Sequence, residues 1–506
     1  MADEAQLSPF VFACQGGLVL DSSTFAMQPG MALELQNFEP DIRGGYRRIS
    51  GYTTWNSNIV PQTSASTEKV LMSAYFKGKV IAARGTKIHE AGKTGSWTEI
   101  DTGRTNAGKY THFRYTLGGT DFIVWADGAN HATKYDGTTV TDLNATGAPA
   151  NPKFVTGHKD TLFFAGMSAN PQSLVYTAPF TDDDFNVANG AGTINVDSDI
   201  TGLFPFRDQL FIFCEERIFK LVGSTQADFV MQPVTREIGC VNGFTIQEVA
   251  GDIIFLGPDG LRTVAGTERI GDVELGTISR PIQRRFQGVS DVDEFDSVVV
   301  PDKTQYRIFF SQGSSKSRGD TTGAIAVRKE QYEFADLRGI RPSSTDSIVT
   351  SGETIVLHGE YDGYVYRQEQ GNVFKSDGSS SNSIVGKYRS PDLTMGDAGI
   401  RKNFQRIIIN YSPEATVNAD LFVRYDYESP DAARPAAYPF DTATSVAVYG
   451  TSVYGTATYG GQSNPLIRQP IEGSGFAVAV RVNDRGTSAP YSLKGFQLEF
   501  DVGARR

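Results

Sequence analysis

The sequence predicts an all-β protein with a β-propeller of six to eight blades followed by a C-terminal β-sandwich. Three observations predict this fold class. The chain is rich in glycine and aromatic residues, a short apolar motif recurs along it, and the pattern changes near residues 375–390. Among the 506 residues are 53 glycines, 32 phenylalanines and 21 tyrosines. Glycine favours turns and aromatic residues favour strands, so this composition indicates short strands joined by tight loops.

The recurring motif consists of a polar or glycine residue, a short apolar run, and a turn that contains glycine or a charge. It occurs at residues 79–83, 121–125, 160–164, 208–213, 252–256, 305–310 and 353–357. Successive motifs begin roughly 40 to 50 residues apart, which is the period of four-stranded propeller blades. Several are followed by a turn and a second strand, as at the Asp-Gly turns of 259–260 and 362–363. The alternative interpretation is a run of unrelated hairpins in two sandwiches.

We therefore expect three regions, which are an extended N-terminal segment at 1–60, the propeller at 61–375 and the sandwich at 385–506. A strand near 18–20 or 32–35 could complete a blade of the propeller, or the segment could dock on another protein. Helical periodicity is nearly absent, and residues 277–286 are the best short candidate.

The strands of the C-terminal region differ from those of the repeats. They follow a polar linker at 377–383. They are long, and they alternate between apolar and polar residues as a half-buried antiparallel sheet does, at 404–411, 419–427, 475–482 and 492–502. Between them, residues 442–462 contain Tyr-Gly pairs that recur every five residues. We expect a projecting loop there, either in contact with a partner or flexible in solvent.

The charge of the chain argues against a protein that grips nucleic acid. Its formal net charge is −11 and no long basic run occurs, whereas phosphate neutralisation supplies most of the affinity for DNA. The basic pairs at 47–48, 284–285 and 505–506 are expected to lie in salt bridges or in solvent. Sequence-specific nucleic-acid binding is therefore not expected, while passive contact with DNA that slides past stays open.

The N-terminus is acidic, and no stretch reaches the ~18 consecutive apolar residues needed to cross a membrane. We therefore expect a soluble protein that is made in a cytoplasm and does not insert into membranes. The three cysteines, Cys14, Cys214 and Cys240, are too few and too irregularly spaced for a disulfide framework or a zinc site. We expect them to be small buried residues, or thiols in a reducing compartment.

No motif for hydrolytic or transfer chemistry occurs in the sequence, so we expect no enzyme and no catalytic, cofactor-binding or metal-binding residues. The five histidines lack zinc spacing and are expected in loops or in the core; they are His89, His112, His131, His158 and His358. Three adjacent aspartates at 182–184 are expected to cap a loop. Residues 197–208 partly imitate a calcium loop but lack its bidentate glutamate. A carboxylate pair for glycoside cleavage stays open, because its members need not be near in sequence.

Three groups of segments resemble a known family. They are residues 33–48 (LELQNFEPDIRGGYRR), then 203–210 (LFPFRDQL), 233–240 (PVTREIGC) and 251–262 (GDIIFLGPDGLR) with their continuation at 268–273 and 278–283, and finally 387–392 (KYRSPD) with 400–406 (IRKNFQR). They resemble the tail-nozzle or packaged-DNA-stabilisation proteins of tailed bacteriophages, including phages of cyanobacteria. The resemblance implies a propeller, a structural role without catalytic residues, and assembly into an oligomer.

These observations favour a non-enzymatic virion structural protein of a bacteriophage tail, as a nozzle, tail-tip or baseplate component. Such a protein would assemble with other tail proteins and with copies of itself in the host cytoplasm, and a role in lining or capping the DNA exit path is open. The second hypothesis is a receptor-binding or fibre-attachment protein whose Tyr-Gly loop and sandwich contact a host glycan. The third is a propeller glycosidase or depolymerase.

Overall fold

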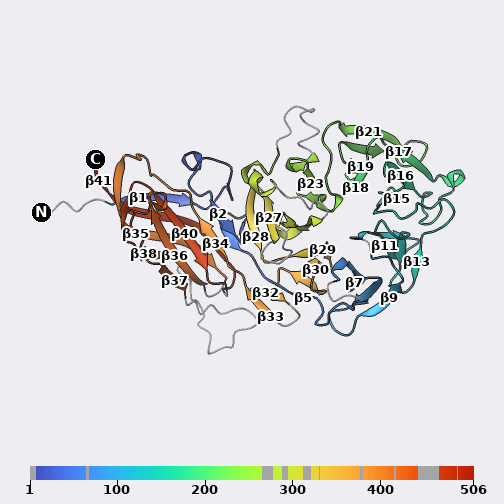
Figure 1. Cartoon of the computed structure of the whole chain (residues 1–506), viewed down its shortest axis with the longest axis horizontal. Coiled ribbons are helices and arrows are strands. Elements are labelled where there is room, and N and C mark those ends of the chain that lie inside the picture. The colour runs from blue at the N-terminus through green and yellow to red at the C-terminus, as the bar shows by residue number, and fades with distance from the viewer. Residues whose placement is uncertain are drawn as a thin grey trace.

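The computed structural model describes residues 7–63, 68–106, 108–264, 277–287, 294–311, 321–329, 331–376, 380–414, 417–442, 466–486 and 488–505. Strands make up 53% of it and helices 5%. Two lobes lie side by side in Figure 1: a ring of short sheets, and a narrower lobe of long strands that holds both the first and the last strand of the chain. The prediction of an all-β propeller followed by a C-terminal sandwich is confirmed.

The ring consists of antiparallel units that follow one another along the chain. Units one to four have four strands each: β6–β9 (Val70–Phe76, Lys79–Arg84, Lys87–Ala91, Thr98–Thr102), β10–β13 (Thr111–Leu117, Thr120–Ala126, Thr133–Tyr135, Val140–Asp142), β14–β17 (Phe154–His158, Thr161–Ala165, Ser173–Tyr176, Gly192–Asn195) and β18–β21 (Ile200–Phe206, Gln209–Cys214, Ile218–Val222, Val230–Thr235).

Three further units complete the ring. Unit five is β22–β24 (Gln247–Val249, Asp252–Gly257, Gly260–Thr263), unit six is β25–β28 (Asp296–Val300, Gln305–Ser311, Thr321–Arg328, Tyr332–Arg338), and unit seven is β29–β31 (Pro342–Thr350, Glu353–Glu360, Val365–Gln368) with β5 (Tyr52–Thr54). The described chain therefore forms seven units, within the expected range of six to eight.

Each of the seven sequence motifs falls on the second strand of its unit. These strands lie between two neighbours in a sheet, and packed sheets cover both of their faces. In β15 and β23, for example, every residue is buried. A continuous apolar run is what a strand buried on both faces requires, which explains why the second strands gave the clearest signal.

The turn before most second strands has a left-handed backbone at two successive residues. These pairs are Lys77-Gly78, Gly118-Gly119, Lys159-Asp160, Arg207-Asp208, Ala250-Gly251 and Ser351-Gly352. Positive φ at both central residues is the signature of the two-residue type I′ hairpin, whose twist matches that of the flanking strands. Neighbouring turns also touch, because Lys159 Nζ lies 2.9 Å from Asp208 Oδ1 and Arg207 donates to the carbonyl of Gly251. We call the side of the ring that carries these turns the hairpin face.

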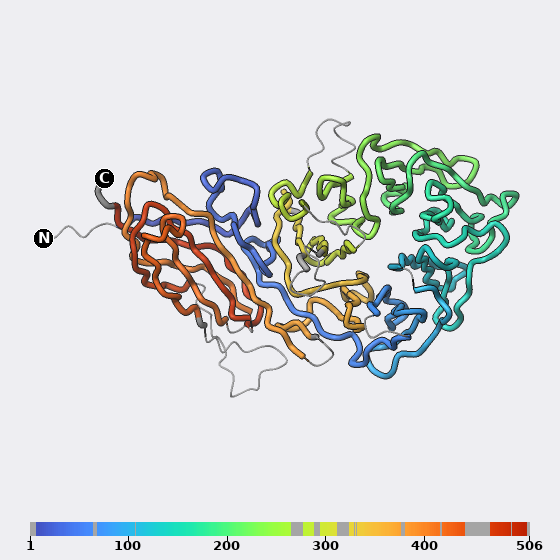
Figure 2. The backbone as a smooth tube through the Cα atoms, in the orientation of Figure 1, coloured from blue at the N-terminus to red at the C-terminus, as the bar shows by residue number. Residues whose placement is uncertain are grey.

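An N-terminal strand closes the ring. β5 pairs antiparallel with β31 of unit seven, and the sheet continues through β32 (Val373–Ser376) and β33 (Ser380–Ser383). Figure 2 shows the blue N-terminal tube running from the sandwich lobe to the ring beside the orange segment. The closing strand is thus neither of the two expected ones. Leu18 makes an isolated bridge to Ala32, and β2 (Glu34–Gln36) lies between β28 and the sandwich.

The sandwich consists of two sheets that share one apolar core. One contains β3 (Phe38–Pro40), β4 (Tyr46–Arg48), β41 (Tyr491–Arg505), β35 (Ile400–Pro413), β38 (Leu466–Pro470), β1 (Ser8–Ala13) and β39 (Ser474–Gly475), and the other contains β34 (Lys387–Arg389), β40 (Val478–Asp484), β36 (Val417–Tyr425) and β37 (Tyr438–Thr442). Along β36, buried and half-buried residues alternate, as the sequence predicted. Rings from the two sheets meet in the core, where the centroids of Phe404 and Tyr425 are 5.3 Å apart.

Three expectations about local structure need comment. The helical candidate at 277–286 is reduced to a 3₁₀ helix, η4 (Arg280–Arg285), which begins at a serine followed by arginine and proline. The predicted strand 419–427 ends at Tyr425, because η7 (Asp426–Glu428) follows it with left-handed backbone at each of its residues. The Tyr-Gly loop lies outside the described residues, apart from its first position.

The two lobes are joined by continuous structure. β25–β28 of unit six continue through β2 into β34, β40, β36 and β37, so one nine-stranded sheet belongs to both lobes. The apolar core is also continuous, since it contains Tyr306 of unit six together with Tyr388 and Phe496 of the sandwich. In addition, Arg48 and Asp484, both fully buried, form an ion pair of 3.4 Å at the junction.

A charged network reinforces the junction. Glu39 of β3 is buried and accepts bonds from Lys303 at 2.6 Å, Arg47 at 3.1 Å and Arg307 at 3.3 Å. Glu369 binds Lys303 and Arg307 as well. Burial alone would raise the pKa of Glu369, but these two cations hold it well below its usual range. Since Lys303 and Arg307 belong to unit six, the network ties the ring to the sandwich.

Candidate functional site

A hollow that combines apolar and charged side chains lies on the axis of the ring. It has a volume of about 340 Å³, and the first strands of the units, or the residues just before them, line it. The units contribute, in order, Met72, His112, Phe154, Phe204, Ile246, Asp296 and Thr345. Because every unit contributes, we call this hollow the axial channel. Its size is at the lower end of the range for small-molecule pockets.

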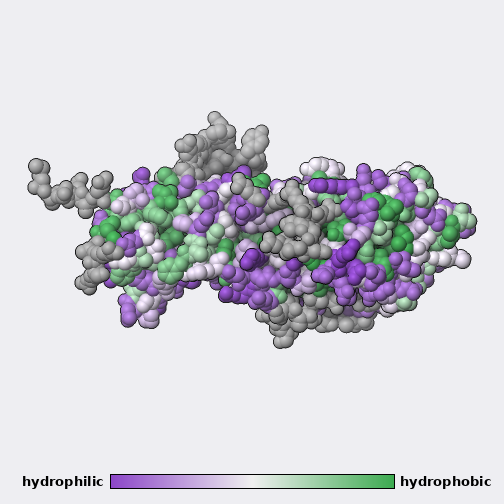
Figure 3. Space-filling model, turned by 90° about the horizontal axis from the view of Figure 1, so that it is seen from above, coloured by the Kyte–Doolittle hydropathy of each residue, from purple (hydrophilic) through white to green (hydrophobic). Residues whose placement is uncertain are grey.

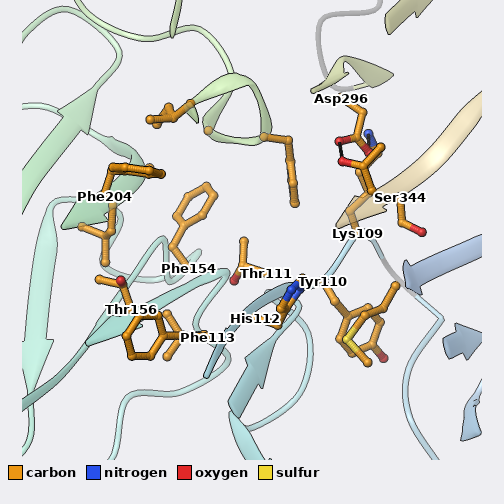
Figure 4. Close-up of a pocket in the computed structure, with 18 of the residues that line it drawn as sticks. Lys109, Tyr110, Thr111, His112, Phe113, Phe154, Thr156, Phe204, Asp296 and Ser344 are labelled. Atoms are coloured by element: carbon orange, nitrogen blue, oxygen red, sulfur yellow. Dashed lines mark hydrogen bonds and ion pairs between the residues drawn. The ribbon is translucent and has the colours of Figure 1, made fainter. Parts of the chain in front are cut away.

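One side of the channel is apolar. Figure 4 shows Phe113, Phe154 and Phe204 on one side, opposite Lys109 and Asp296. These rings come from units two, three and four. Phe113 packs so closely on the neighbouring strand that a Cβ at Gly157 would lie 2.4 Å from the ring, which explains the glycine there.

The opposite side holds a buried ion pair. Lys109 Nζ lies 3.3 Å from Asp296 Oδ2 and donates to the carbonyl of Phe295 at 2.9 Å. The hydroxyl of Thr345 donates to the other oxygen of Asp296 at 2.8 Å. Lys109 precedes unit two and Asp296 begins unit six, so the pair spans the ring rather than joining neighbours. Both charges are paired and hydrogen-bonded, as buried charges must be.

A second ionic contact, centred on Asp346 of unit seven, lies further toward the hairpin face. Its carboxylate accepts bonds from the backbone N–H of Tyr75 at 2.8 Å, from His112 Nε2 at 3.2 Å and from the guanidinium of Arg114. Burial alone would raise the pKa of Asp346, but Arg114 and His112 hold it well below its usual range. Asp346 therefore connects unit seven with units one and two, where the ring closes. We call this group the closure cluster.

The contact of His112 with Asp346 has two of the three parts of a catalytic triad, since a carboxylate orients an imidazole. The third part would be a hydroxyl or thiol next to the imidazole. Over the described ranges, no such group is hydrogen-bonded to His112. The nearby hydroxyls have other partners, because Ser344 donates to Ser73 at 3.1 Å and Thr345 binds Asp296. The contacts of Asp346 hold strands of units one, two and seven together.

The structure disperses the other histidines. His89 and His158 are buried in units one and three, where burial lowers the pKa of both. His358 is buried in unit seven and contacts Gln368 at 3.2 Å, while His131 is exposed in unit two. Among the described residues, no group of three or more His, Cys, Asp and Glu could hold a metal ion.

The acidic clusters have structural partners. Asp182 lies 2.7 Å from Lys134 Nζ, and Asp183 and Asp184 accept bonds from the backbone N–H groups of residues 145 and 186. The last bond caps a turn, as expected for these aspartates. Residues 197–208 contain strand β18 and form no loop; at their two ends Asp197 pairs with Arg217, and Asp208 pairs with Lys159 in a hairpin turn. The two ends of the imitated calcium loop thus face different cations.

The three cysteines are buried and unpaired. Burial raises the pKa of Cys214 and Cys240 to about 12, and burial also raises the pKa of Cys14. Thiols in this state are poor nucleophiles and poor metal ligands. In the part of the chain that the structure describes, the helices are too short and too polar to cross a membrane.

Sequence reasoning missed the residues that line the channel. Lys109 and Asp296 carry charge on the channel wall, and Arg114 carries charge in the closure cluster, but their partners are far away in sequence. One signal was present at 111–116, a segment of the predicted propeller region in which His and Arg alternate with aromatic residues. A charge on a strand that should be buried indicates an internal ionic contact or a site.

Comparisons with known proteins add little about function. No family model and no curated protein matches the chain. Among solved structures, the extracellular domain of a hybrid two-component system of B. thetaiotaomicron has a TM-score of 0.41 at 8% identity, over 70% of this chain and 43% of that one. Raptor of Chaetomium thermophilum has a TM-score of 0.41 at 9% identity, over 64% and 29%. The chain thus spans less than half the length of these two proteins.

Proposed function

We propose that the protein is a non-enzymatic structural component of a bacteriophage tail, at the nozzle, tail tip or baseplate, that assembles with other tail proteins. The observation that carries the proposal is the rigid joint between ring and sandwich. A component of a virion transmits load between its neighbours, and a body whose two lobes share one sheet and one core can do so without bending. The resemblance of residues 33–48, of the segments between 203 and 283, and of 387–392 and 400–406 to tail proteins points to the same role.

The joint is stronger than an ordinary contact between domains. Most neighbouring domains of one chain meet at polar surfaces and move relative to one another. Here the nine-stranded sheet, the buried Arg48–Asp484 pair and the network around Glu39 all cross the boundary. A hinge at this position would break backbone hydrogen bonds and leave buried charges without partners, which costs several kcal/mol.

The sandwich lobe also offers apolar surface for assembly. Large exposed apolar residues of this lobe and of the N-terminal segment beside it include Val11, Phe25, Ile42, Val385, Tyr427, Leu466, Phe476 and Val502. On the face seen in Figure 3, green apolar residues lie over the sandwich lobe at the left and also over the ring at the right. Val11 is 67% exposed on β1, which pairs on one side only with β41 among the described strands. Contacts with neighbouring tail proteins or with copies of the chain would cover such a surface.

Any DNA path would have to run outside the ring of a single copy. The axial channel has a volume of about 340 Å³ and is crossed by Lys109 and Asp296, so it accommodates a small molecule and not a duplex. A passage for DNA would therefore lie between several copies around a tail axis. A net charge of −11 would keep such a wall from binding DNA firmly.

Mass spectrometry and cryo-electron microscopy of purified virions from the source of the sequence test the proposal. Peptides of this chain in the particle, and its density in a ring around the tail axis, are the expected result. Density at the tips of fibres would replace the proposal with the receptor-binding hypothesis. Absence of the chain from the particles would overturn both. Activity on polysaccharide in the purified protein would contradict the non-enzymatic role.

A further inference from the structure

A second hollow lies on the hairpin face, between units two and three. Its volume is about 330 Å³, and its lining includes Phe113, Tyr115, Leu162, Phe180, Thr116 and Thr181. The hollow is apart from the polar side of the axial channel. It is bordered by the turn Lys159-Asp160 and by the loop between β16 and β17, so it opens beside the type I′ hairpins. We call it the Phe180 hollow.

Phe180 is the unusual residue of this hollow. Its side chain is 70% exposed, and its backbone has a φ of +59°. A bulky residue in the left-handed region is strained, and folding gains little from a ring that stays in solvent. The conformation is held by the surroundings, since the N–H of Phe180 donates to the carbonyl of Asp160 at 2.8 Å and Thr181 Oγ1 donates to the carbonyl of Ala178 at 2.7 Å. Strain that the rest of the structure maintains is a mark of functional positions.

The other aromatic residues of the hollow are fixed in place. Tyr115 stacks on Phe122 with ring centroids 5.5 Å apart, and its hydroxyl donates to Asp182 at 3.1 Å. Phe113 lies against Gly157, which leaves no room for a side chain at that position. The hollow is therefore preorganised, and a ligand would not have to order these rings when it binds.

The two cations that line the hollow are already paired with carboxylates, and the lining also contains Asp160 and His158. Lys159 is paired with Asp208, and Arg114 is paired with Asp346. A phosphate, sulfate or nucleic acid would have to compete with these carboxylates. The rest of the lining combines aromatic and aliphatic carbon with the hydroxyls of Thr116 and Thr181, which donate to Asp121 and to the carbonyl of Ala178 and can accept a bond from a ligand. Such a lining suits a neutral ligand that has one apolar face and several hydroxyl groups.

We propose that the Phe180 hollow is a binding site for a neutral saccharide, with the ring of Phe180 stacked on a sugar face at the rim. A volume of about 330 Å³ is enough for one or two sugar units. The site does not depend on where the protein sits in a particle, so it stands or falls separately from the proposed function. An apolar peptide of a partner protein is the competing occupant, which the experiment distinguishes.

Saturation-transfer-difference NMR of the full chain tests the site. The probes are the methyl glycosides of glucose, galactose, mannose and N-acetylglucosamine, and the disaccharides maltose and cellobiose. Transfer to at least one of them is expected, and titration of that sugar should show about tenfold weaker binding for Phe180→Ala, the scale of one lost stacking contact. The control is Phe25→Ala, which removes a ring of similar exposure (76%) elsewhere and should leave binding unchanged.

A second variant separates binding from stability. Phe180→Gly places glycine at a left-handed position, so it should raise the melting temperature while it weakens sugar binding. A ring that merely supports the fold would give the opposite change in melting temperature. The proposal is overturned if none of the six sugars shows transfer, or if Phe180→Ala binds the sugar as wild type does. It is also overturned if a phenylalanine-rich peptide displaces the sugar only from a site that is still present in the Phe180 variants, because the sugar would then bind elsewhere.

Discussion

The closure cluster gives a prediction that can be worked out from the geometry. Asp346→Ala removes a buried carboxylate that accepts bonds from Tyr75, His112 and Arg114. Hydrogen bonds to a charged group contribute about 1.5–3 kcal/mol each, but they are not additive, and breaking a buried pair costs about 3–5 kcal/mol in total. Arg114 keeps one partner, because its Nε donates to the carbonyl of Tyr75 at 2.7 Å. We therefore expect a loss of unfolding free energy of about 3–4 kcal/mol.

Differential scanning calorimetry measures this loss. With an unfolding entropy of about 2.1 cal/mol/K per residue, the whole chain gives ~1.1 kcal/mol/K, so the melting temperature should fall by about 3–4 °C. Asp346→Asn should fall by less, since the amide oxygen can still accept from Tyr75. The matched control is Asp197→Ala, which breaks the exposed pair with Arg217 and should change the free energy by less than about 1 kcal/mol. If Asp346→Ala lowers the melting temperature no more than Asp197→Ala does, the closure cluster does not hold the ring together.

Three further predictions concern pH, a turn and the thiols. Because the pKa of Glu369 is lowered in the folded state, its contribution to the free energy of unfolding is present above its unfolded pKa of about 4.3 and is lost as the pH falls below that value. Glu369→Gln should therefore flatten the fall in melting temperature between about pH 5 and pH 2. An unchanged dependence of melting temperature on pH would contradict this. Gly119→Val, at a φ of +82° in open space, should lower the free energy of unfolding by about 1–2 kcal/mol, whereas Gly92→Val, at a position without positive φ, should lower it by less. Equal losses would mean that the left-handed backbone of the turn does not disfavour a side chain. The folded protein should show no thiol that reacts with Ellman's reagent at pH 8, and three such thiols after denaturation in guanidinium. The reason is that Cys214 and Cys240 have a pKa of about 12 and that all three thiols are buried. A thiol that reacts rapidly in the native state would show that its burial is incomplete.

The sequence was most informative where one strand alone determined the pattern. The run 252–256 is apolar because every residue of β23 is buried, and the alternation of 417–425 follows from the half-buried sheet of β36. Both features are local, so periodicity revealed them.

Features that depend on distant partners could not be read in the same way. Nothing in residues 52–54 indicates that they pair with β31, and the expected closing strands at 18–20 and 32–35 were more apolar than the real one. The charges of the axial channel could not be predicted either, because Lys109 forms a buried ion pair only once the fold brings Asp296 beside it. The Phe180 hollow depends on a backbone angle that the sequence does not specify, since phenylalanine rarely adopts it.

The closing strand sets the order in which the molecule can be made. β5 leaves the ribosome early, but its partners β31 and β32 are translated only after the six other units of the ring. β1 and β4 find their partner later still, because both pair with β41, which is translated after β31 and β32. Until then the N-terminal segment exposes unpaired strands, which are prone to pair with another chain. The ring is therefore completed before the sandwich, and a nascent chain that stalls before β41 would leave β1 and β4 without this partner strand.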